Sequence, residues 1–102
     1  MISRGDVCVA DIPGVGRHPV VVVTRDTAIP LLTSVVCVLV TSHIRGHVAE
    51  VQVGQDEGLR DESAANCDNL FTLPKTVLRR VGRLGPAKSY ELDAALAVAL
   101  AL

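Results

Sequence analysis

Short apolar stretches, separated by glycine, proline and acidic residues, run through the first four fifths of the chain. Each stretch either alternates apolar with polar positions or is a run of β-branched residues, and both patterns are typical of strands. The predicted strands cover residues 7–12, 19–24, 35–41 and 48–53, with shorter ones around 67–70 and over 80–84. The run from Val20 to Val23 is apolar throughout, which predicts a strand buried on both faces. One helical turn is expected within residues 72–78.

The hydrophobic period becomes helical near the end of the chain. The apolar positions that repeat there are Leu92, Leu96, Ala99 and Leu100. They predict a helix over about 89–102, with Ser89 as its N-cap and Glu91 in its first turn. Because this helix has almost no polar residue after Asp93, it must be covered on more than one side. We therefore expect a homodimer or another partner to cover it.

Together these elements predict a mainly β fold, a small antiparallel barrel with a C-terminal α-helix. The strands follow one another closely and no long helix lies between them, as in small barrels. A length of 102 residues suits one domain with a modest core. No linker or internal repeat divides residues 1–102, so we expect a single domain.

The composition narrows the class of protein further. Hydrophobic residues make up 49% of the chain but aromatic residues only 2%, so the core must consist of Val, Leu, Ile and Ala. Cys8, Cys37 and Cys67 are odd in number, widely spaced and set in apolar stretches, so we interpret them as core residues. No signal peptide and no apolar run long enough to span a bilayer are visible. We expect a cytoplasmic protein without a metal or another cofactor.

Charge is distributed unevenly, although the net charge is only −1. Acidic residues dominate positions 50–68, and basic residues dominate positions 69–88. This asymmetry fits two oppositely charged faces, and it also fits two solvated faces without a partner. In the basic segment, Arg79 and Arg80 are candidates for contact with a phosphate backbone, with a purely surface role as the alternative.

Polar side chains capable of acid–base chemistry stand at the ends of two predicted strands. Arg17 and His18 precede the valine strand, and Thr41 ends the strand over 35–41. Metal-independent phosphodiester transfer on RNA needs a group that moves a proton and donors for the phosphate oxygens. Histidine, arginine and a hydroxyl can fill these roles, but the same residues are also compatible with ordinary solvated strand ends. The residues after Thr41 that we expect to contact RNA are Ser42, His43 and Arg45.

Five segments of the chain resemble the MazF/PemK family of toxin endoribonucleases. In chain order they are RGDVCVADIPG, GRHPVVVVTRD, VLVTS, CDNL and RRVGRL, and the resemblance covers roughly residues 3–100. It implies an SH3-like barrel with a C-terminal helix, usually a homodimer. It also implies metal-independent, sequence-specific cleavage of single-stranded RNA that leaves a 2′,3′-cyclic phosphate and a 5′-hydroxyl. A cognate, MazE-like antitoxin with a disordered tail that blocks the RNA site is implied as a partner.

The family's catalytic pair maps onto two positions of this chain. The family has an arginine just before the proline of the second strand and a threonine at the end of the third. Thr41 matches the threonine, but His18 stands where the arginine is expected, and Arg17 stands one position earlier. Three interpretations follow, of which we favour the first. His18 transfers the proton while Arg17 holds phosphate, or Arg17 replaces the missing arginine, or the toxin is weakened or inactive but still binds its antitoxin.

A different class of function also fits the resemblance. The chain could be a non-catalytic toxin relative that binds an antitoxin, or one that inhibits a protein target such as DNA gyrase. The scarcity of aromatic side chains bears on both classes, because single-stranded RNA usually stacks on such rings. If the protein binds RNA, the affinity should depend on charge and fall steeply with salt.

Overall fold

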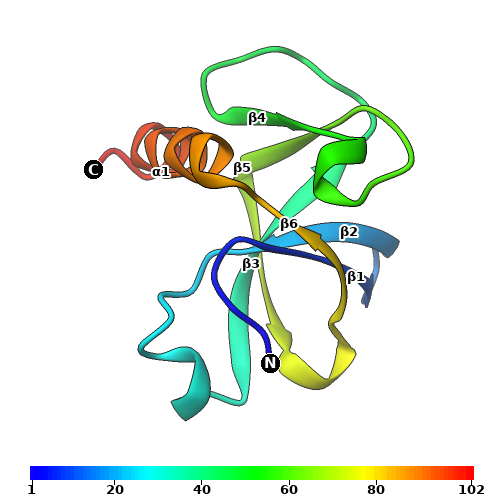
Figure 1. The fold of residues 1–102 in the computed structure, drawn as a ribbon, viewed down its shortest axis with the longest axis vertical. Coiled ribbons are helices and arrows are strands. Elements are labelled where there is room, and N and C mark those ends of the chain that lie inside the picture. Colours follow the sequence, from blue (N-terminus) through cyan, green and yellow to red (C-terminus); the bar gives the residue numbers. More distant parts are fainter.

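Six strands and one α-helix, with three short 3₁₀ turns, make up the computed structural model, which describes residues 1–102 (Figure 1). The strands are β1 (Asp6–Ile12), β2 (Gly16–Val22), β3 (Ser34–Thr41), β4 (Glu50–Val53), β5 (Ser63–Pro74) and β6 (Arg79–Arg83). The helix is α1 (Pro86–Leu100), and the turns are η1 (Ile29–Leu31), η2 (Gln55–Glu57) and η3 (Lys75–Val77). The turn expected within 72–78 and the strand expected over 80–84 are therefore confirmed.

All six strands join one antiparallel sheet in the order β4-β5-β3-β2-β1-β6. The sheet curls into a half-barrel, and α1 packs against β4 and β5 near its open side (Figure 1). This architecture confirms the predicted mainly β barrel with a C-terminal helix. None of the helices has the length and hydropathy that crossing a membrane requires.

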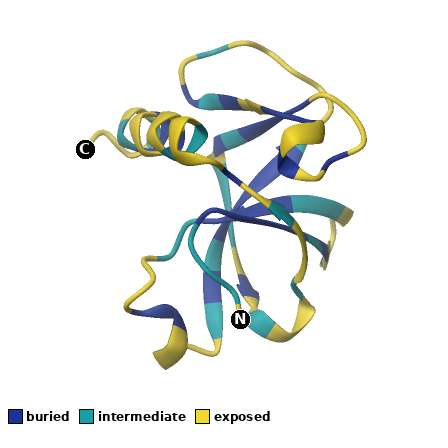
Figure 2. Ribbon diagram, in the orientation of Figure 1, coloured by how far each residue is buried: buried dark blue, intermediate teal, exposed yellow.

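Two core clusters lie on the two faces of the curled sheet, because strand side chains alternate between faces. The first core cluster includes Val7, Val21, Val38, Val40 and the α1 residues Leu92, Ala95 and Leu96. The second core cluster includes Cys8, Ala10, Val20, Val22, Cys37 and Leu39. Both appear as the buried centre of the strands in Figure 2, with exposed residues at the loops and on the outer side of α1.

The valine strand is buried on both faces, as its composition predicts. Val20, Val21 and Val22 have no exposed surface. Its bounds differ from the expected 19–24, because pairing with β1 continues through a tight turn to Ile12 opposite Gly16. Gly14 and Gly16 both have positive φ there, which glycine tolerates without strain. As a result, Arg17 and His18 lie within the strand rather than in front of it.

β5 is much longer than the short strand expected around 67–70. It pairs with β3 along most of its length and with β4 near its start. The β3 pairing jumps from Val38–Leu70 to Leu39–Asn66, so β5 bulges between the two pairs. The bulge hides its alternation in the sequence, which explains why only its middle was expected to be a strand.

The start of the helix differs from the expected one. α1 begins at Pro86 with Gly85 as its N-cap, so Ser89 is not the cap residue. Proline suits the first helical position because its missing N–H has no partner there in any helix. Within the chain only one side of α1 is buried, by Leu92, Ala95 and Leu96. The exposed apolar residues near its end are Val98, Leu100 and Leu102.

A backbone-to-backbone contact holds β6 against the end of η2. A Cβ on Gly82 would lie 2.1 Å from the carbonyl oxygen of Glu57, and a Cβ on Gly58 would lie 2.3 Å from that of Val81. Gly58 also has a φ of 89°, which other residues rarely adopt. Only glycine at both positions allows this approach.

The three cysteines are buried free thiols, as predicted. Burial raises the pKa of Cys8 to about 11, with the Asp6 carboxylate adding to the effect and Arg80 opposing it. Burial likewise raises the pKa of Cys37 to about 12 and that of Cys67 to about 11. Since the thiolate is the reactive form, these side chains are core residues without nucleophilic character near neutral pH.

Candidate functional site

The pairing of β2 with β3 brings His18 and Thr41 to the same place in the sheet. The pairs are Val20–Leu39, Val21–Val38 and Val22–Cys37. Continued outward from the Val20–Leu39 pair, the same antiparallel register sets His18 opposite Thr41. The ladder itself stops at Val20 and Leu39, so the two strand ends are not bonded to each other at this point.

His18 and Thr41 also belong to the same face of the sheet. His18 is paired with Ala10, and Ala10 and Val20 lie in the second core cluster. Leu39 lies in that cluster as well, and Thr41 follows it by two residues, which is one strand repeat. Both side chains are only partly buried. The register therefore places an imidazole and a hydroxyl on the same face, at the neighbouring ends of β2 and β3.

The hydroxyl of Thr41 is held by the chain that follows it. Its Oγ1 accepts a hydrogen bond from the backbone N–H of His43 at 3.1 Å. A hydroxyl has one proton to donate besides the lone pairs that accept. The Thr41 hydroxyl is thus fixed in position, and its own proton remains available for a ligand oxygen.

The loop after Thr41 is organised by the carboxylate of Glu50. Its Oε1 accepts hydrogen bonds from the backbone N–H groups of Arg45 (3.1 Å) and Gly46 (2.7 Å). Nδ1 of His47 accepts the Ala49 N–H, so its ring proton sits on Nε2, 3.5 Å from Glu50 Oε2. The side chains of Ser42, His43 and Arg45 are left exposed, beside the end of β3.

Arg17 does not share the face of His18 and Thr41. It is paired with Asp11 of β1, on the opposite side of the strands. Arg17 instead lines a small hollow with Arg79 from the start of β6. Sequence reasoning treated Arg17 and His18 as one pair, but adjacent strand residues point to opposite faces.

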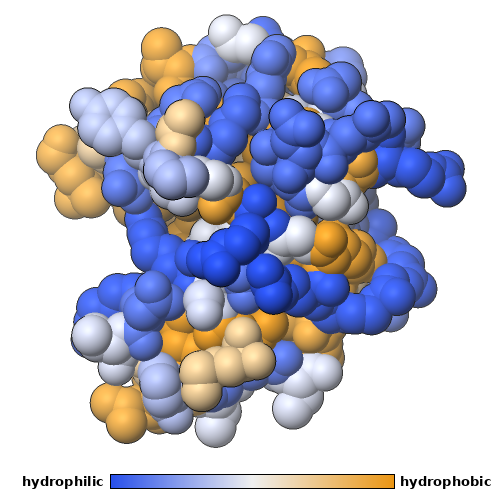
Figure 3. Space-filling view, viewed as in Figure 1, coloured by the Kyte–Doolittle hydropathy of each residue, from blue (hydrophilic) through white to orange (hydrophobic).

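The two neighbouring arginines of β6 have different surroundings. Arg80 Nε lies 3.4 Å from Oδ1 of Asp6, whose side chain is almost fully buried. The other oxygen of Asp6 accepts the backbone N–H of Ser3 at 2.9 Å. Arg80 is therefore occupied in neutralising a buried carboxylate, whereas the side chain of Arg79 has no ion-pair or hydrogen-bond partner in the chain. Hydrophilic side chains cross the middle of the face in Figure 3, in the region of β6.

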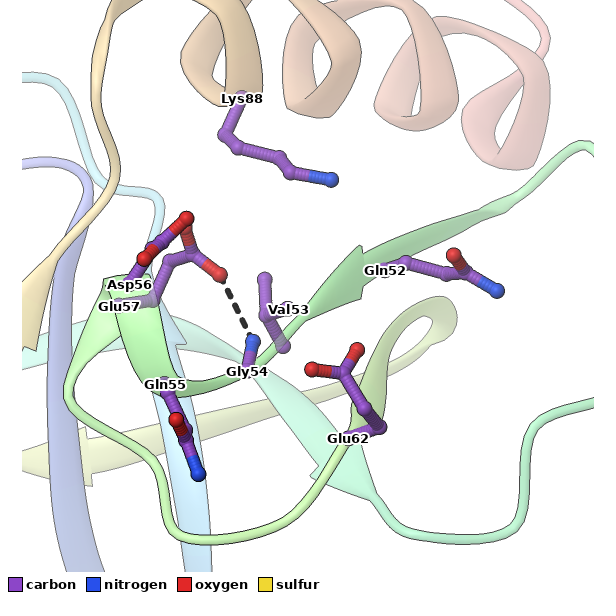
Figure 4. Close-up of a pocket in the computed structure, with 8 residues that line it drawn as sticks. All are labelled: Gln52, Val53, Gly54, Gln55, Asp56, Glu57, Glu62 and Lys88. Atoms are coloured by element: carbon purple, nitrogen blue, oxygen red, sulfur yellow. Dashed lines mark hydrogen bonds between the residues drawn. The ribbon is translucent and has the colours of Figure 1, made fainter.

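A second hollow, of about 290 Å³, lies beneath the start of α1 and is acidic. We call it the acidic hollow; its charged residues are Asp56, Glu57, Glu62 and Lys88 (Figure 4). Glu57 Oε1 accepts the Gly54 N–H at 2.7 Å, which holds the η2 turn together. Three carboxylates against one ammonium group make this hollow unsuitable for a phosphate.

A third hollow, of about 550 Å³, is mostly apolar and runs between the end of α1 and the sheet. Leu96, Leu100 and Leu102 line it, and at its edge Arg4 Nη2 contacts Asp93 Oδ1 at 2.6 Å. Arg4 also donates to the Val23 carbonyl and so connects α1 to the end of β2. No group of three or more His, Cys, Asp or Glu side chains is arranged to hold a metal ion.

Comparison with known proteins identifies the family. Residues 3–100 match the family model of the PemK-like, MazF-like toxins of type II toxin–antitoxin systems. The chain belongs to this family. It is 39% identical over 92 residues to probable endoribonuclease MazF2 of Mycobacterium tuberculosis, covering 88% of this chain and 89% of that protein. It is 38% identical over 101 residues to probable endoribonuclease MazF5 of the same organism, covering 96% and 92%.

Solved structures support the assignment of this chain to the MazF/PemK-like toxins. The M. tuberculosis toxin MazF-mt6 superposes with a TM-score of 0.87 at 32% identity, over 95% of this chain and 97% of that one. A mycobacterial endoribonuclease solved in complex with its cognate antitoxin gives 0.90 at 31% identity, over 100% and 97%. The predicted family, fold and class of enzyme, an endoribonuclease toxin, are therefore confirmed.

Asp11 and Glu50 are parts of this region that sequence reasoning missed. Glu50 lies in the strand expected over 48–53 and was given no further role, although a carboxylate shortly after a glycine-containing loop can accept the loop's amide protons. Asp11 could have been connected to Arg17 from the short turn between them, which brings the two residues opposite each other.

Proposed function

We propose that this toxin cleaves single-stranded RNA without a metal ion, using His18 and Thr41. The 2′-oxygen of one nucleotide attacks the adjacent phosphorus, so a P–O2′ bond forms and the P–O5′ bond breaks. The products are a 2′,3′-cyclic phosphate and a 5′-hydroxyl. This is the reaction that the family resemblance implies, and it needs only proton transfer and charge stabilisation.

His18 acts as the base in this proposal. An imidazole can accept a proton near neutral pH, so it can take the proton of the 2′-hydroxyl as the P–O2′ bond forms. The leaving 5′-oxygen takes a proton from solvent. The Thr41 hydroxyl donates a hydrogen bond to a phosphate oxygen as negative charge develops on it. The exposed side chains of Ser42, His43 and Arg45 contact the RNA next to the cleaved bond.

One observation supports this assignment above the others. The β2–β3 register sets His18 opposite Thr41, and strand alternation turns both toward one face. Side chains opposite each other on one face are close enough to reach a common small group. The backbone contact from His43 keeps the Thr41 hydroxyl in a defined position.

The test is cleavage of a long single-stranded RNA in EDTA, with the new ends mapped chemically. We expect discrete sites with cyclic phosphate ends for the wild type. His18→Ala should lower kcat by about 10²–10⁴-fold, the usual contribution of a general base. Thr41→Ala should lower it by about 10²-fold or more, as for a lost donor to a developing oxyanion. A fully active His18→Ala variant, together with an inactive Arg17→Ala variant, would refute the assignment.

A non-catalytic toxin is the second candidate, favoured by the histidine at the position where the family has its arginine. Such a protein would bind its antitoxin or inhibit a protein target such as DNA gyrase. Growth arrest in cells with intact RNA in the EDTA assay would support it, whereas mapped cleavage sites would exclude it.

The proposed partners follow from the same function. A MazE-like antitoxin would bind this toxin and block the RNA site, and both would act in the cytoplasm, where messenger RNA is translated. We also propose a homodimer, because Val98, Leu100 and Leu102 expose apolar surface at the end of α1. Light scattering on the purified toxin tests it, and a monomer at micromolar concentration would contradict it.

A further inference from the structure

The small hollow beside the start of β2 has a chemistry of its own. Its volume is about 110 Å³, and its lining residues are Val9, Ala10, Asp11, Arg17, Val77 and Arg79. We call it the arginine hollow. The two arginines come from strands that are far apart in the sequence, and they meet because β1 pairs with both β2 and β6. The pairs that set the geometry are Asp11–Arg17 and Val9–Arg79.

Both guanidinium groups are available for a ligand. Neither guanidinium group makes a hydrogen bond or an ion pair within the chain, and both residues are exposed. Arg80, next in sequence, is by contrast committed to the buried Asp6. Two free guanidinium groups around one small hollow suit a phosphate, which accepts forked hydrogen bonds from arginine.

The position of the hollow separates it from the cleavage chemistry. Arg17 and His18 are adjacent, but their side chains leave β2 on opposite faces. The arginine hollow therefore cannot hold the phosphate that lies between His18 and Thr41. It lies at the same strand end, so an RNA chain that passes this end carries a further phosphate toward it.

We propose that Arg17 and Arg79 together bind a phosphate of the RNA other than the one that is cleaved, and so position the substrate. This inference rests on the proposed RNA substrate. It gives the toxin an electrostatic hold that compensates for its lack of stacking residues, since Phe71 packs half-buried against the second core cluster. Asp11 lies opposite Arg17 and weakens the hold by its negative charge.

The test compares Arg17→Ala, Arg79→Ala and the double variant with Arg60→Ala. Arg60 is exposed in the loop before β5 and lines none of the hollows, so it controls for loss of one positive charge. We expect each hollow variant to raise KM by about 5–10-fold with kcat within about twofold. Each should also reduce the slope of log affinity against log salt by about one, and Arg60→Ala should not. The double variant should lose less than the product of the single effects, because both arginines hold one phosphate.

Binding of an uncleavable 2′-O-methyl RNA oligonucleotide keeps this test separate from the proposed cleavage. If wild-type protein binds the oligonucleotide but cuts no RNA, the cleavage mechanism fails, while the salt slopes still decide the role of the arginines. If wild-type protein cuts RNA but Arg17→Ala and Arg79→Ala leave both KM and the salt slope unchanged, the arginine hollow is not a phosphate site. A loss of kcat alone in Arg17→Ala would also overturn the inference.

Discussion

The two faces of β2 at its exposed end carry different chemistry on neighbouring residues. On one face the strand register sets His18 opposite Thr41, above the second core cluster, with groups that can move a proton and donate to an oxygen. On the other face Arg17 and Arg79 line the arginine hollow, with groups that can hold charge but not transfer protons. In the proposed function, adjacent residues of one strand end therefore serve bond cleavage on one face and substrate binding on the opposite face.

In the proposed function, this difference explains how the toxin works with a histidine where the family pattern has an arginine. An arginine could serve both for charge and for positioning, whereas a histidine brings the proton transfer but less permanent charge. The arginine hollow on the opposite face would then supply the permanent charge separately. The comparison therefore predicts that substitutions of His18 or Thr41 lower kcat, whereas substitutions of Arg17 or Arg79 raise KM.

The largest change in stability is expected when β6, which carries Arg79 of the arginine hollow, is displaced. In Gly82→Ala the new Cβ would meet the Glu57 carbonyl oxygen at 2.1 Å, so the backbone must move. We expect a loss of about 3 kcal/mol or more in the free energy of unfolding, measured by chemical denaturation. Gly85→Ala is the control, because a Cβ there meets nothing within 4 Å. Equal stability of the two variants would show that the η2–β6 contact is not tight.

The next largest effect is the pH dependence of stability that the buried thiols of the two core clusters cause. Cys8 and Cys37 belong to the second cluster and Cys67 to the first. Their folded pKa values lie above the ordinary value of 9.0, so the folded state keeps protons that the unfolded state releases. Stability should therefore be complete below pH 9 and fall as the pH rises toward about 11.

The expected fall is on the order of 2 kcal/mol per thiol, and denaturation curves at several pH values measure it. Lysine and tyrosine residues titrate in the same range, so the informative quantity is the difference from a Cys67→Ala variant. That variant should lose less stability between pH 9 and 11 than the wild type. The same pH dependence in both proteins would mean that Cys67 is not protected by burial.

A smaller effect tests whether position 18 needs a proton acceptor or only a positive charge. His18→Arg introduces the residue that the family pattern has at this position and removes the imidazole. If His18 is the base, kcat should fall by about tenfold or more, because a guanidinium stays protonated and does not accept the 2′-hydroxyl proton. Single-turnover cleavage rates of the two proteins on the same RNA measure the change. An unchanged kcat would assign the proton transfer elsewhere.

The smallest effect concerns Asp11, whose negative charge opposes phosphate binding at the arginine hollow. Asp11→Asn removes the negative charge opposite Arg17 while keeping a side chain of the same shape. We expect affinity for RNA to rise by about threefold at low salt, because exposed charges interact by less than about 1 kcal/mol. Fluorescence anisotropy with the 2′-O-methyl oligonucleotide measures it. Weaker binding would mean that Asp11 positions Arg17 rather than opposing the phosphate.

Much of the fold was predictable because local patterns and burial agree. The valine run required two buried faces, and Val20, Val21 and Val22 have them. The start of α1 was missed because Gly85 and Pro86, which directly follow the strand expected over 80–84, can end a strand as well as begin a helix. The length of β5 was missed because its bulge interrupts the alternation on which strand prediction depends.

The candidate site was predictable in part. Histidine and threonine at strand ends were identified from residue type, but their juxtaposition depends on the β2–β3 register, which the intervening loop does not reveal. That Arg17 and His18 point apart could have been inferred from alternation alone. The meeting of Arg17 with Arg79 could not, because it requires β1 to pair with a strand near the end of the chain.

Glu50 supports the loop after Thr41 from within, through the backbone amides of Arg45 and Gly46. None of the outward side chains at 42–45 takes part in that support. If these side chains contact RNA as proposed, substitutions there should alter which nucleotides are preferred while the path of the main chain persists. A toxin gene that duplicates can thereby acquire a new target sequence through single codon changes, without first having to regain a stable fold.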